Sequence, residues 1–317
     1  MKIGFVLDPL PSLNIKKDSS YAMMAEAAAR GHELYAMQQD GLVWKRNSVF
    51  GVMSELTLEK TPQGWYSLDP ALELPLAQLD CVLMRKDPPF DVEYVTTTWL
   101  LEQAEREGAR VFNQPRALRD HSEKMAIAEF SRFVAPTLVS RSANQLHGFI
   151  DQHGDVILKP LDAMGGQSVF RVREGDPNRN VIVETLSDLG RHTVMAQRYI
   201  PEIRDGDKRV LVIGGKPVPY CLARIPRAGE TRGNLAAGGT GVARPLSPRD
   251  LEIAQALGPE LARRGLLLVG LDVIGDWLTE INVTSPTCFQ EITQQTGFNV
   301  AGLFLDELER ACAGARA

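Results

Sequence analysis

Cysteine is scarce in this chain, with four residues among 317, at positions 81, 221, 288 and 312, and no two of them at CxxC spacing. Disulfide frameworks and cysteine-based zinc sites typically show closely spaced cysteines, so the sequence suggests neither kind of scaffold. Cys288 lies close to the most informative motif, but nothing in the sequence marks a histidine partner or a lowered pKa for it. We therefore expect a small thiol that is buried or half-buried.

Long apolar runs and an excess of positive charge are also absent. No apolar run approaches the ~20 residues needed to span a bilayer, and the N-terminal stretch MKIGFVLDP predicts a β-strand rather than a signal peptide. The formal net charge is −5, and the chain has no basic run or RNA-binding signature. We therefore expect a cytoplasmic protein that binds neither a membrane nor a nucleic acid.

The loop after the first predicted strand lacks the glycine fingerprint of dinucleotide-binding proteins. A strand over Lys2–Asp8, a helix over Ser19–Arg30 and a strand over His32–Met37 form a β-α-β opening, which is typical of a parallel sheet. The connection between the first two elements reads PLPSLNIKKDSS and contains no GxGxxG. Those glycines let a pyrophosphate approach the helix N-terminus, so a hydride-transferring oxidoreductase is disfavoured.

The features that are present describe a globular α/β chain of ordinary composition. A length of 317 residues suggests about two domains, and 44% hydrophobic with 24% charged residues is typical of globular proteins. The first half continues with a strand over Cys81–Met84, a helix over Val92–Glu107 and a strand over Arg110–Asn113. Residues 41–80 lack periodicity and predict a hairpin or an irregular excursion.

The pattern changes in the second half, and we place a domain boundary near residue 120. One helix is predicted across this boundary, over Gln114–Phe130, with His121 at its surface. Further strands are predicted over Val156–Pro160, Val169–Val172, Met195–Ile200, Asp207–Val212 and Lys216–Pro219. Helices are predicted over Ser247–Arg264 and Val300–Cys312.

A lysine and a glycine pair in the second half suggest an anion site. Lys159 lies at the end of the strand Val156–Pro160, and Gly165-Gly166 occupies the loop that follows. Adjacent glycines let backbone N–H groups approach an anion closely and form a nest around it. The glycine pair alone is also compatible with an ordinary turn.

Basic residues follow the predicted strand Cys81–Met84 directly. In open α/β sheets, ligands bind at the carboxyl ends of strands, which is where Arg85 and Lys86 lie. The two side chains could hold a carboxylate, or they could belong to a solvated loop, and the sequence does not decide between these interpretations.

Three further arginines lie in unusual surroundings. Arg209 and Arg224 are embedded in apolar strands, where an unpaired charge is expensive, so each needs an internal carboxylate or a ligand phosphate. Residues 225–245 contain five glycines and no apolar periodicity, which predicts either a lid over a site or a disordered insertion. Arg232 lies within this segment and could reach a phosphate when a lid closes.

The stretch Gly265–Pro286 predicts a β-hairpin, because two apolar runs flank a turn signal at Gly275-Asp276. If Ile274 pairs with Leu278 across a three-residue loop, Asp272 lies opposite Glu280. The same face then carries Asn282, and the other face carries Leu271, Val273, Ile281 and Val283. A two-residue loop would move Glu280 to the apolar face. The pattern therefore favours an odd-numbered loop or a β-bulge.

The polar face of this hairpin offers two carboxylates and one amide oxygen. An oxygen-only set suits Mg²⁺, which takes one or two carboxylates and completes its octahedron with water and substrate phosphates. An ordinary solvated hairpin can show the same residue types, so the interpretation depends on the other parts of a nucleotide site found in the chain.

Seven segments together carry a more specific pattern than any single motif. They read NIKKDSS (14–20), MRKDPPFD (84–91), LKPLDAMGG (158–166), DGDKRVLV (205–212), YCLARIP (220–226), ETRGNLAAGG (230–239) and LTEINVTSPT (278–287). In this order they resemble the ATP-grasp ligases and, more narrowly, the bacterial glutathione synthetase family. The resemblance covers essentially the whole chain and is weakest around residues 41–70.

The resemblance implies an α/β fold built from two domains. Residues 1–120 would form a three-layer, parallel-sheet domain of the pre-ATP-grasp type that binds substrate. Residues 121–317 would form an α+β ATP-grasp domain with antiparallel sheets. Its central subdomain would cover residues 121–200, and its C-terminal subdomain would cover 201–317 and carry the lid at 225–245.

The resemblance also implies a reaction. Members of this family join γ-glutamylcysteine and glycine to form glutathione through an acyl phosphate, and they release ADP and phosphate. It further implies Mg²⁺, with Mn²⁺ as a possible substitute, and a homo-oligomer, either a dimer or a tetramer. The alternatives are another carboxylate-amine ligase, such as a D-alanine–D-alanine ligase or a glutamate ligase, and a nucleotide-binding module without activity.

Roles for individual residues follow from the same resemblance. ATP would be bound by Lys124, Lys159, Gly165, Gly166, Gln197, Arg198, Tyr199, Ile200 and Asp207. The catalytic arginines would be Arg209, Arg224 and Arg232, and the metal ligands Asp272, Glu280 and Asn282. The dipeptide or glycine would contact Arg85, Asn282 and Ser285.

Overall fold

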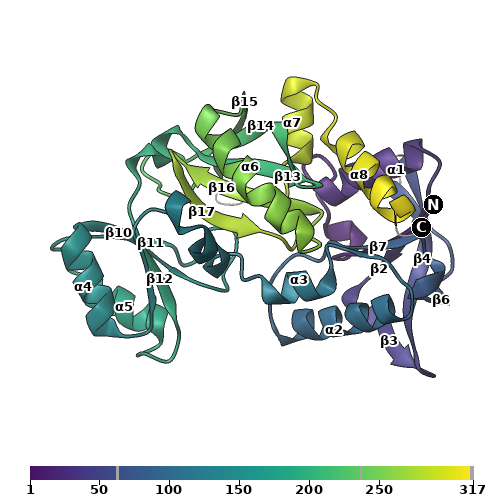
Figure 1. Cartoon of the computed structure of the whole chain (residues 1–317), viewed down its shortest axis with the longest axis horizontal. Coiled ribbons are helices and arrows are strands. Elements are labelled where there is room, and N and C mark those ends of the chain that lie inside the picture. Colours follow the sequence, from purple (N-terminus) through teal and green to yellow (C-terminus); the bar gives the residue numbers. More distant parts are fainter. Residues whose placement is uncertain (62–63, 236–237, 315–317) are drawn as a thin grey trace.

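A computed structural model of the chain describes residues 1–61, 64–235 and 238–314. Within these residues the strands form three sheets of eight, four and five strands, with helices packed on them (Figure 1). The mixed α/β class is the one that the sequence predicts. Among the described helices, none combines the length and the apolar character that crossing a membrane requires.

The N-terminal sheet is built around β1 (Lys2–Val6), which pairs in parallel with β2 (Glu33–Met37) and β7 (Cys81–Met84). β8 (Val111–Phe112) pairs in parallel with β7. All four residues of β7 are buried, as expected for a parallel strand that is covered on both faces. The β-α-β opening predicted from the sequence is confirmed.

Two helices of this region begin at aspartate caps. In α1 (Ser19–Ala29) the Asp18 side chain accepts a hydrogen bond from the Tyr21 N–H, and in α2 (Val92–Arg106) Asp91 accepts one from Tyr94. A carboxylate at this position satisfies an otherwise unpaired backbone donor of the first turn. The caps therefore fix where both helices begin.

The excursion predicted for residues 41–80 consists of antiparallel strands. They are β3 (Leu42–Lys45), β4 (Ser48–Thr61), β5 (Gly64–Leu68) and β6 (Leu72–Pro75). β4 pairs with β2, so these strands extend the N-terminal sheet instead of forming a separate unit.

The four-stranded sheet lies at one end of the molecule (Figure 1, teal, at the left). Its strands are β9 (Thr137–Ser140), β10 (Asp155–Pro160), β11 (Phe170–Arg173) and β12 (Val194–Arg198), and its helices are α4 (Ala143–His153) and α5 (Arg179–Ser187). Leu146 and Ile150 of α4 pack with Val183 of α5 and with the apolar residues of β10 in a core of their own.

The five-stranded antiparallel sheet runs in the order β15-β14-β13-β16-β17. These strands are β13 (Asp207–Ile213), β14 (Lys216–Ile225), β15 (Thr240–Pro245), β16 (Leu268–Ile274) and β17 (Trp277–Asn282). The sheet is accompanied by α6 (Pro248–Arg263), α7 (Phe289–Thr296) and α8 (Val300–Gly314). Short 3₁₀ helices lie at Leu10–Ser12, Gln39–Gly41, Leu76–Gln78, Met125–Phe133 and Pro201–Asp205.

One predicted helix is broken in the structure. The segment Gln114–Phe130 contains α3 (Pro115–Asp120), an extended residue at His121 and then the 3₁₀ helix Met125–Phe133. His121 is buried, so its predicted surface position was wrong. After the break the chain reaches β17, where the Glu123 carbonyl accepts a hydrogen bond from the Ile281 N–H at 2.9 Å.

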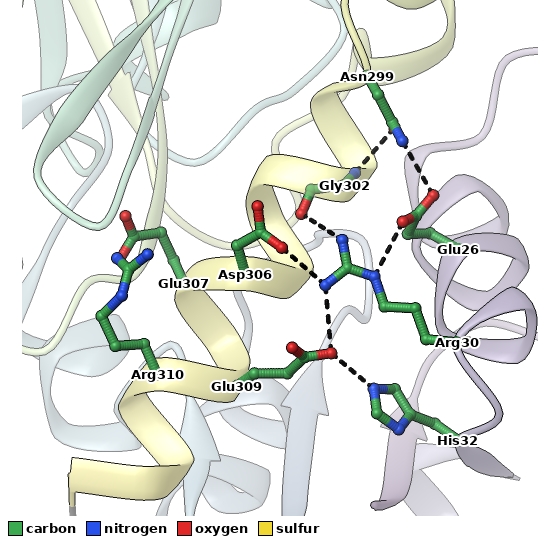
Figure 2. Close-up of polar contacts among 9 residues, drawn as sticks. All are labelled: Glu26, Arg30, His32, Asn299, Gly302, Asp306, Glu307, Glu309 and Arg310. Atoms are coloured by element: carbon green, nitrogen blue, oxygen red, sulfur yellow. Dashed lines mark hydrogen bonds and ion pairs between the residues drawn. The ribbon is translucent and has the colours of Figure 1, made fainter.

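The C-terminal helix packs against the N-terminal sheet region. Arg30, at the end of α1, bonds Glu26 on its own helix and the Gly302 carbonyl and Asp306 carboxylate on α8 (Figure 2). His32 bonds Glu309 at 2.8 Å on the next turn of α8. An apolar core that joins α1 and α8 lies beside these contacts.

Candidate active site

A cavity of about 330 Å³ is lined by residues of the four-stranded and five-stranded sheets. Sixteen of the seventeen residues predicted as site residues line it. They are Lys124, Lys159, Gly165, Gly166, Gln197, Arg198, Tyr199, Ile200, Asp207, Arg209, Arg224, Arg232, Asp272, Glu280, Asn282 and Ser285. Residues spread over more than 160 positions of sequence therefore meet in one site.

The β16–β17 hairpin places Asp272 directly opposite Glu280. The three-residue loop was wrong, because Ile274 pairs with Trp277 across a two-residue turn. The predicted alternative, a bulge, is what the structure contains: the register shifts next to Asp272, and Thr279 is the extra residue. The bulge restores the parity that the short turn removes, so both carboxylates lie on the same face.

Asp272 is buried and held by two guanidinium groups. Arg209 donates from Nε to Oδ1 at 2.6 Å, and Arg224 Nη2 lies 2.9 Å from Oδ2. Burial opposes ionisation of this carboxyl, but Arg209 and Arg224 outweigh it and hold its pKa well below the ordinary value. Gly270 makes room for Arg209, because a Cβ there would lie 2.8 Å from Arg209 Cδ. The embedded arginines thus pair with internal carboxylates inside the cavity.

Asp207 is the second carboxylate that pairs with Arg224. Its Oδ2 lies 2.6 Å from Arg224 Nη2, whereas its buried Oδ1 has no hydrogen-bond partner among the described residues. Burial raises the pKa of Asp207 to about 6, although Arg224 acts in the opposite direction. An unsatisfied buried acceptor in a cavity suits a ligand that brings a hydroxyl or N–H donor.

Two lysines approach the hairpin from other elements. Lys159 of β10 is buried, and burial lowers its pKa even though Glu280 favours the charged form. Lys124 lies 3.1 Å from Glu280 Oε1 and donates to the Ala163 carbonyl at 2.6 Å. Lys124 therefore links the hairpin to the start of the glycine loop.

The glycine loop has backbone angles that favour glycine, with φ of +62° at Gly165 and +80° at Gly166. Arg232 Nη1 donates to the Gly166 carbonyl at 3.4 Å, and a Cβ on Gly166 would lie 2.6 Å from Asn234 Oδ1. The segment predicted as a lid or an insertion therefore lies against the glycine loop at the cavity. Residues 236–237 of this segment lie outside the described residues.

The strip Gln197–Ile200 forms another wall of the cavity. Tyr199 donates its N–H to the Asp155 carbonyl, and the Arg171 guanidinium lies 3.5 Å from the centre of the Tyr199 ring. The Asp155 carboxylate binds Arg171 through both oxygens, at 2.8 and 2.5 Å. Asp155 thus fixes both the backbone of Tyr199 and the cation stacked on its ring.

Arg85 is the predicted site residue that does not line the cavity. Its buried guanidinium donates to the Ser20 hydroxyl and the Pro286 carbonyl, each at 3.0 Å. Ser285, which does line the cavity, donates to the Arg85 carbonyl at 3.3 Å. The Arg85 side chain therefore holds the segment after β17 against α1. The sequence had suggested either a carboxylate site or a solvated loop for Arg85 and Lys86, and neither interpretation included this structural role.

Sequence reasoning missed several residues of the cavity wall. They include Asp87, Pro88, Glu123, Asn234, Thr284 and Thr287. Asp87 follows Arg85 and Lys86 at the carboxyl end of β7, so the strand-end rule could have found it. Glu123 had no signal except its place beside Lys124. Cys288 also lines the cavity. It is a buried thiol, as expected from the sequence, and burial raises its pKa.

The hairpin fits a hard divalent cation. Asp272 and Glu280 supply carboxylate oxygens, and Asn282 donates its Nδ2 to the Gly270 carbonyl at 3.3 Å, which leaves Oδ1 for a cation. Among the described residues, no three His, Cys, Asp or Glu side chains are grouped to hold a metal by themselves. The donor set therefore fits an ion that completes its coordination with phosphate oxygens and water, as Mg²⁺ does.

Two family models match the chain. The model described as "Prokaryotic glutathione synthetase, N-terminal domain" matches residues 1–119, and "Prokaryotic glutathione synthetase, ATP-grasp domain" matches residues 123–297. The break between the matched ranges falls at the interrupted helix after α3.

Curated relatives are similar over almost their whole length. The "Glutathione synthetase" of Ralstonia nicotianae is 63% identical over 316 residues, covering 99% of this chain and 97% of the relative. That of Nitrosomonas europaea is 60% identical over 316 residues, covering 99% of each.

A solved structure supports the fold. The ATP-grasp ligase PsnB, in complex with a minimal precursor, Mg and ADP, is similar with a TM-score of 0.62 at 18% identity, covering 98% of both chains. With both domains matched and identities of 60% and above, this chain belongs to the prokaryotic glutathione synthetase family of ATP-dependent ligases with the ATP-grasp fold.

Proposed function

We propose that this chain joins the cysteinyl carboxylate of γ-glutamylcysteine to the amine of glycine, forming glutathione while ATP is converted to ADP and phosphate. The observation that carries the proposal is the charge arrangement of one cavity. Arg209, Arg224, Lys124 and Lys159 face the carboxylates of the hairpin there. Such an arrangement suits a ligand with several negative charges that are redistributed during reaction.

The chemistry requires an activated carboxylate, because a carboxylate is a poor electrophile at neutral pH. In the proposed sequence a carboxylate oxygen of the dipeptide attacks the γ-phosphorus, and ADP leaves with the electron pair of the broken P–O bond. The product is an acyl phosphate. The glycine amine then attacks its carbonyl carbon, phosphate leaves with the C–O electrons, and the new amide loses a proton. The protein contributes mainly position and charge stabilisation.

The arginines would act on both steps. Arg209 and Arg224 are buried, and their aspartate partners hold them in fixed orientations. Fixed donors stabilise developing charge without having to reorganise during the reaction. We assign them to the acyl phosphate and to the tetrahedral intermediate, and we assign Arg232 to the same phosphate from the lid side.

The nucleotide would lie between the four-stranded and five-stranded sheets. Lys124 and Lys159 would contact its phosphates together with the backbone of Gly165 and Gly166. The strip from Gln197 through Arg198 and Tyr199 to Ile200 would line the adenine pocket. The unpaired Oδ1 of Asp207 supports its assignment to the ribose hydroxyls.

ATP-grasp ligases use ATP together with a divalent metal, and we propose Mg²⁺, with Mn²⁺ able to replace it. Glu280, Asn282 and Asp272 would hold the ion. When bound, the metal neutralises phosphate charge and aligns the γ-phosphate. Asp272 must then share oxygens with Arg209 and Arg224, whose charges remain beside it.

Other residues are assigned to the two amino-acid substrates. Ser285 and Asn282 would contact the dipeptide or glycine, and Arg85 would contribute by holding the backbone near Ser285. The segment 225–245 would exclude water from the acyl phosphate, and the hydrogen bond from its Arg232 to the Gly166 carbonyl supports this assignment. We further propose that the enzyme works in the cytoplasm as a homo-oligomer, either a dimer or a tetramer.

The direct test measures ADP release by the purified chain with ATP, Mg²⁺ and γ-glutamylcysteine against a panel of amines. Glycine is expected to give the highest kcat/KM, with no release above the ATPase background when the dipeptide is omitted. Preference for D-alanine, glutamate or another amine would contradict the substrate assignment. Absence of ADP release with every amine would contradict the ligase activity itself.

A further inference from the structure

Glu123 accepts four hydrogen bonds from one short segment, three from backbone N–H groups and one from a side-chain hydroxyl. Its Oε1 accepts from the Val283 N–H at 2.8 Å, the Thr284 N–H at 3.0 Å and the Thr284 hydroxyl at 2.9 Å. Its own carbonyl accepts from the Ile281 N–H at 2.9 Å. Three donors on one carboxylate oxygen form a charge-assisted clamp, so residues 281–284 are held from outside their own sheet.

The clamped piece carries or adjoins two of the proposed metal ligands. Glu280 directly precedes it, and Asn282 lies between two of the residues that bond Glu123. β17 is at the edge of the sheet, so its outer backbone groups face no other strand within the part of the chain that the structure describes. Glu123 supplies partners on that open side, at the point where the strand ends.

The next residue in the chain contacts one of these two ligands, Glu280. Lys124 pairs with Glu280 and also donates to the Ala163 carbonyl before the glycine loop. The bend after α3 therefore delivers two consecutive side chains to one strand end, one bonded to its backbone and one to its carboxylate. A neutral replacement for Glu123 that still accepts hydrogen bonds would keep the first contact.

We propose that Glu123 is a positioning residue, which fixes the backbone of residues 281–284 and so sets the directions of Glu280 and Asn282 toward the cation. Groups that orient metal ligands in this way typically contribute about 10-fold to 100-fold to metal affinity. The inference rests on the metal site proposed above. Its Oε1 is occupied by three donors, so Glu123 acts through its neighbours and not as a ligand through that oxygen.

The test measures binding of a non-hydrolysable ATP analogue by calorimetry, at a series of Mg²⁺ concentrations and without the other substrates. Mg²⁺ is expected to increase the affinity for the analogue. In Glu123→Ala, the Mg²⁺ concentration that gives half of the maximal increase is expected to rise by about tenfold or more. The affinity of this variant for the analogue in EDTA stays at the wild-type value. Glu123→Gln is expected to remain within about threefold of wild type, because its amide oxygen accepts from the same donors.

Glu129→Gln is the matched control. Glu129 lies six residues further along the same segment, outside the cavity, and pairs with Arg264. Its variant is expected to keep the wild-type Mg²⁺ dependence. Thermal unfolding of each variant accompanies the titration, so that a loss of the fold is recognised.

The outcomes separate the inference from the function on which it rests. If wild type shows no Mg²⁺ dependence, the proposed metal site fails. If wild type depends on Mg²⁺ but Glu123→Ala does not differ from it, only the positioning role fails. If Glu123→Gln is as weak as Glu123→Ala, the charge itself is needed and Glu123 is not a positioning residue.

If Glu123→Ala does not fold, a second variant tests the positioning role of Glu123. Thr284→Val removes one of the three donors and leaves the carboxylate in place. It is expected to shift the Mg²⁺ midpoint by about threefold, which is below the full effect of losing an orienting group. A midpoint equal to that of wild type would overturn the proposal.

Discussion

Asp272 and Glu280 lie opposite each other on adjacent strands because Thr279 is an extra residue in β17. Without that residue, the two-residue turn would put Glu280 on the apolar face of the hairpin. The Thr279 hydroxyl donates to the Asp272 carbonyl at 3.1 Å, which ties the bulge to the strand it faces. The bulge is therefore the local feature that brings the two carboxylates into one cavity.

Glu280→Gln should abolish turnover and leave the fold intact. The variant keeps the size of the side chain but removes a charge that faces Lys124 and the proposed cation. Loss of several kcal/mol of charge stabilisation predicts turnover below about one thousandth of wild type. Initial rates of ADP release and thermal unfolding curves measure the two quantities. Near-normal turnover in a folded variant would discredit the metal assignment.

Arg224→Ala should act mainly on kcat. Removing one fixed donor to a developing oxyanion is expected to cost about 3 kcal/mol, roughly a hundredfold in rate. Arg224 also compensates Asp207 and Asp272, so thermal unfolding must be recorded alongside steady-state kinetics. If the variant raises KM for ATP and keeps kcat, Arg224 is a binding residue and not a catalytic one.

Arg171→Met should weaken ATP binding although Arg171 is not a predicted ligand. The guanidinium stacks on Tyr199, and losing that contact is expected to raise KM for ATP by about threefold to tenfold, equivalent to about 1 kcal/mol. The same change at Arg173 is the control, because that side chain is largely exposed and lies 3.8 Å from the shared partner Asp155. Equal effects of the two variants would argue against the stacking role.

His121 should make the protein less stable in mild acid. Burial, with Arg264 next, lowers its pKa from 6.5 to about 4, and its Nε2 has no hydrogen-bond partner among the described residues. Between these values the unfolded chain binds a proton that the folded chain excludes. Stability is therefore fully present above about pH 6.5 and is lost as the pH falls toward 4, by up to about 3 kcal/mol.

Denaturant unfolding of wild type and His121→Leu at pH 7.5 and 4.5 tests this pH dependence. The free energy of unfolding should fall less in the variant than in wild type over this interval, because the variant has no imidazole to protonate. Identical falls in both proteins would show that other groups cause the acid sensitivity.

The sequence predicted which residues line one cavity better than it predicted local geometry. The alternation of side chains along the hairpin required Asp272 and Glu280 to share one face. A three-residue loop and a two-residue turn with a β-bulge both give this arrangement, so the sequence could not choose between them. The positions of Arg209 and Arg224 in apolar strands correctly indicated that each needs a partner. Their partners, Asp207 and Asp272, depend on strand pairing across the sheet.

The surroundings of two other residues could not be predicted from the sequence, because tertiary packing determines them. His121 lies in a helical pattern with polar neighbours, and only the break after α3 turns it into the interior. Arg85 follows a buried strand, as a ligand-binding residue would. Its guanidinium instead donates a hydrogen bond to the carbonyl of Pro286, 201 residues away. Such contacts leave no periodic signal in the sequence.

Oxygen transfer tests the proposed reaction most directly. γ-Glutamylcysteine labelled with ¹⁸O in its cysteinyl carboxylate is incubated with ATP, Mg²⁺, glycine and the enzyme, and the released phosphate is analysed by mass spectrometry. An acyl phosphate predicts that each phosphate carries one oxygen from the carboxylate, because the carboxylate attacks phosphorus and the C–O bond later breaks. Phosphate without label, released together with glutathione, would contradict the account.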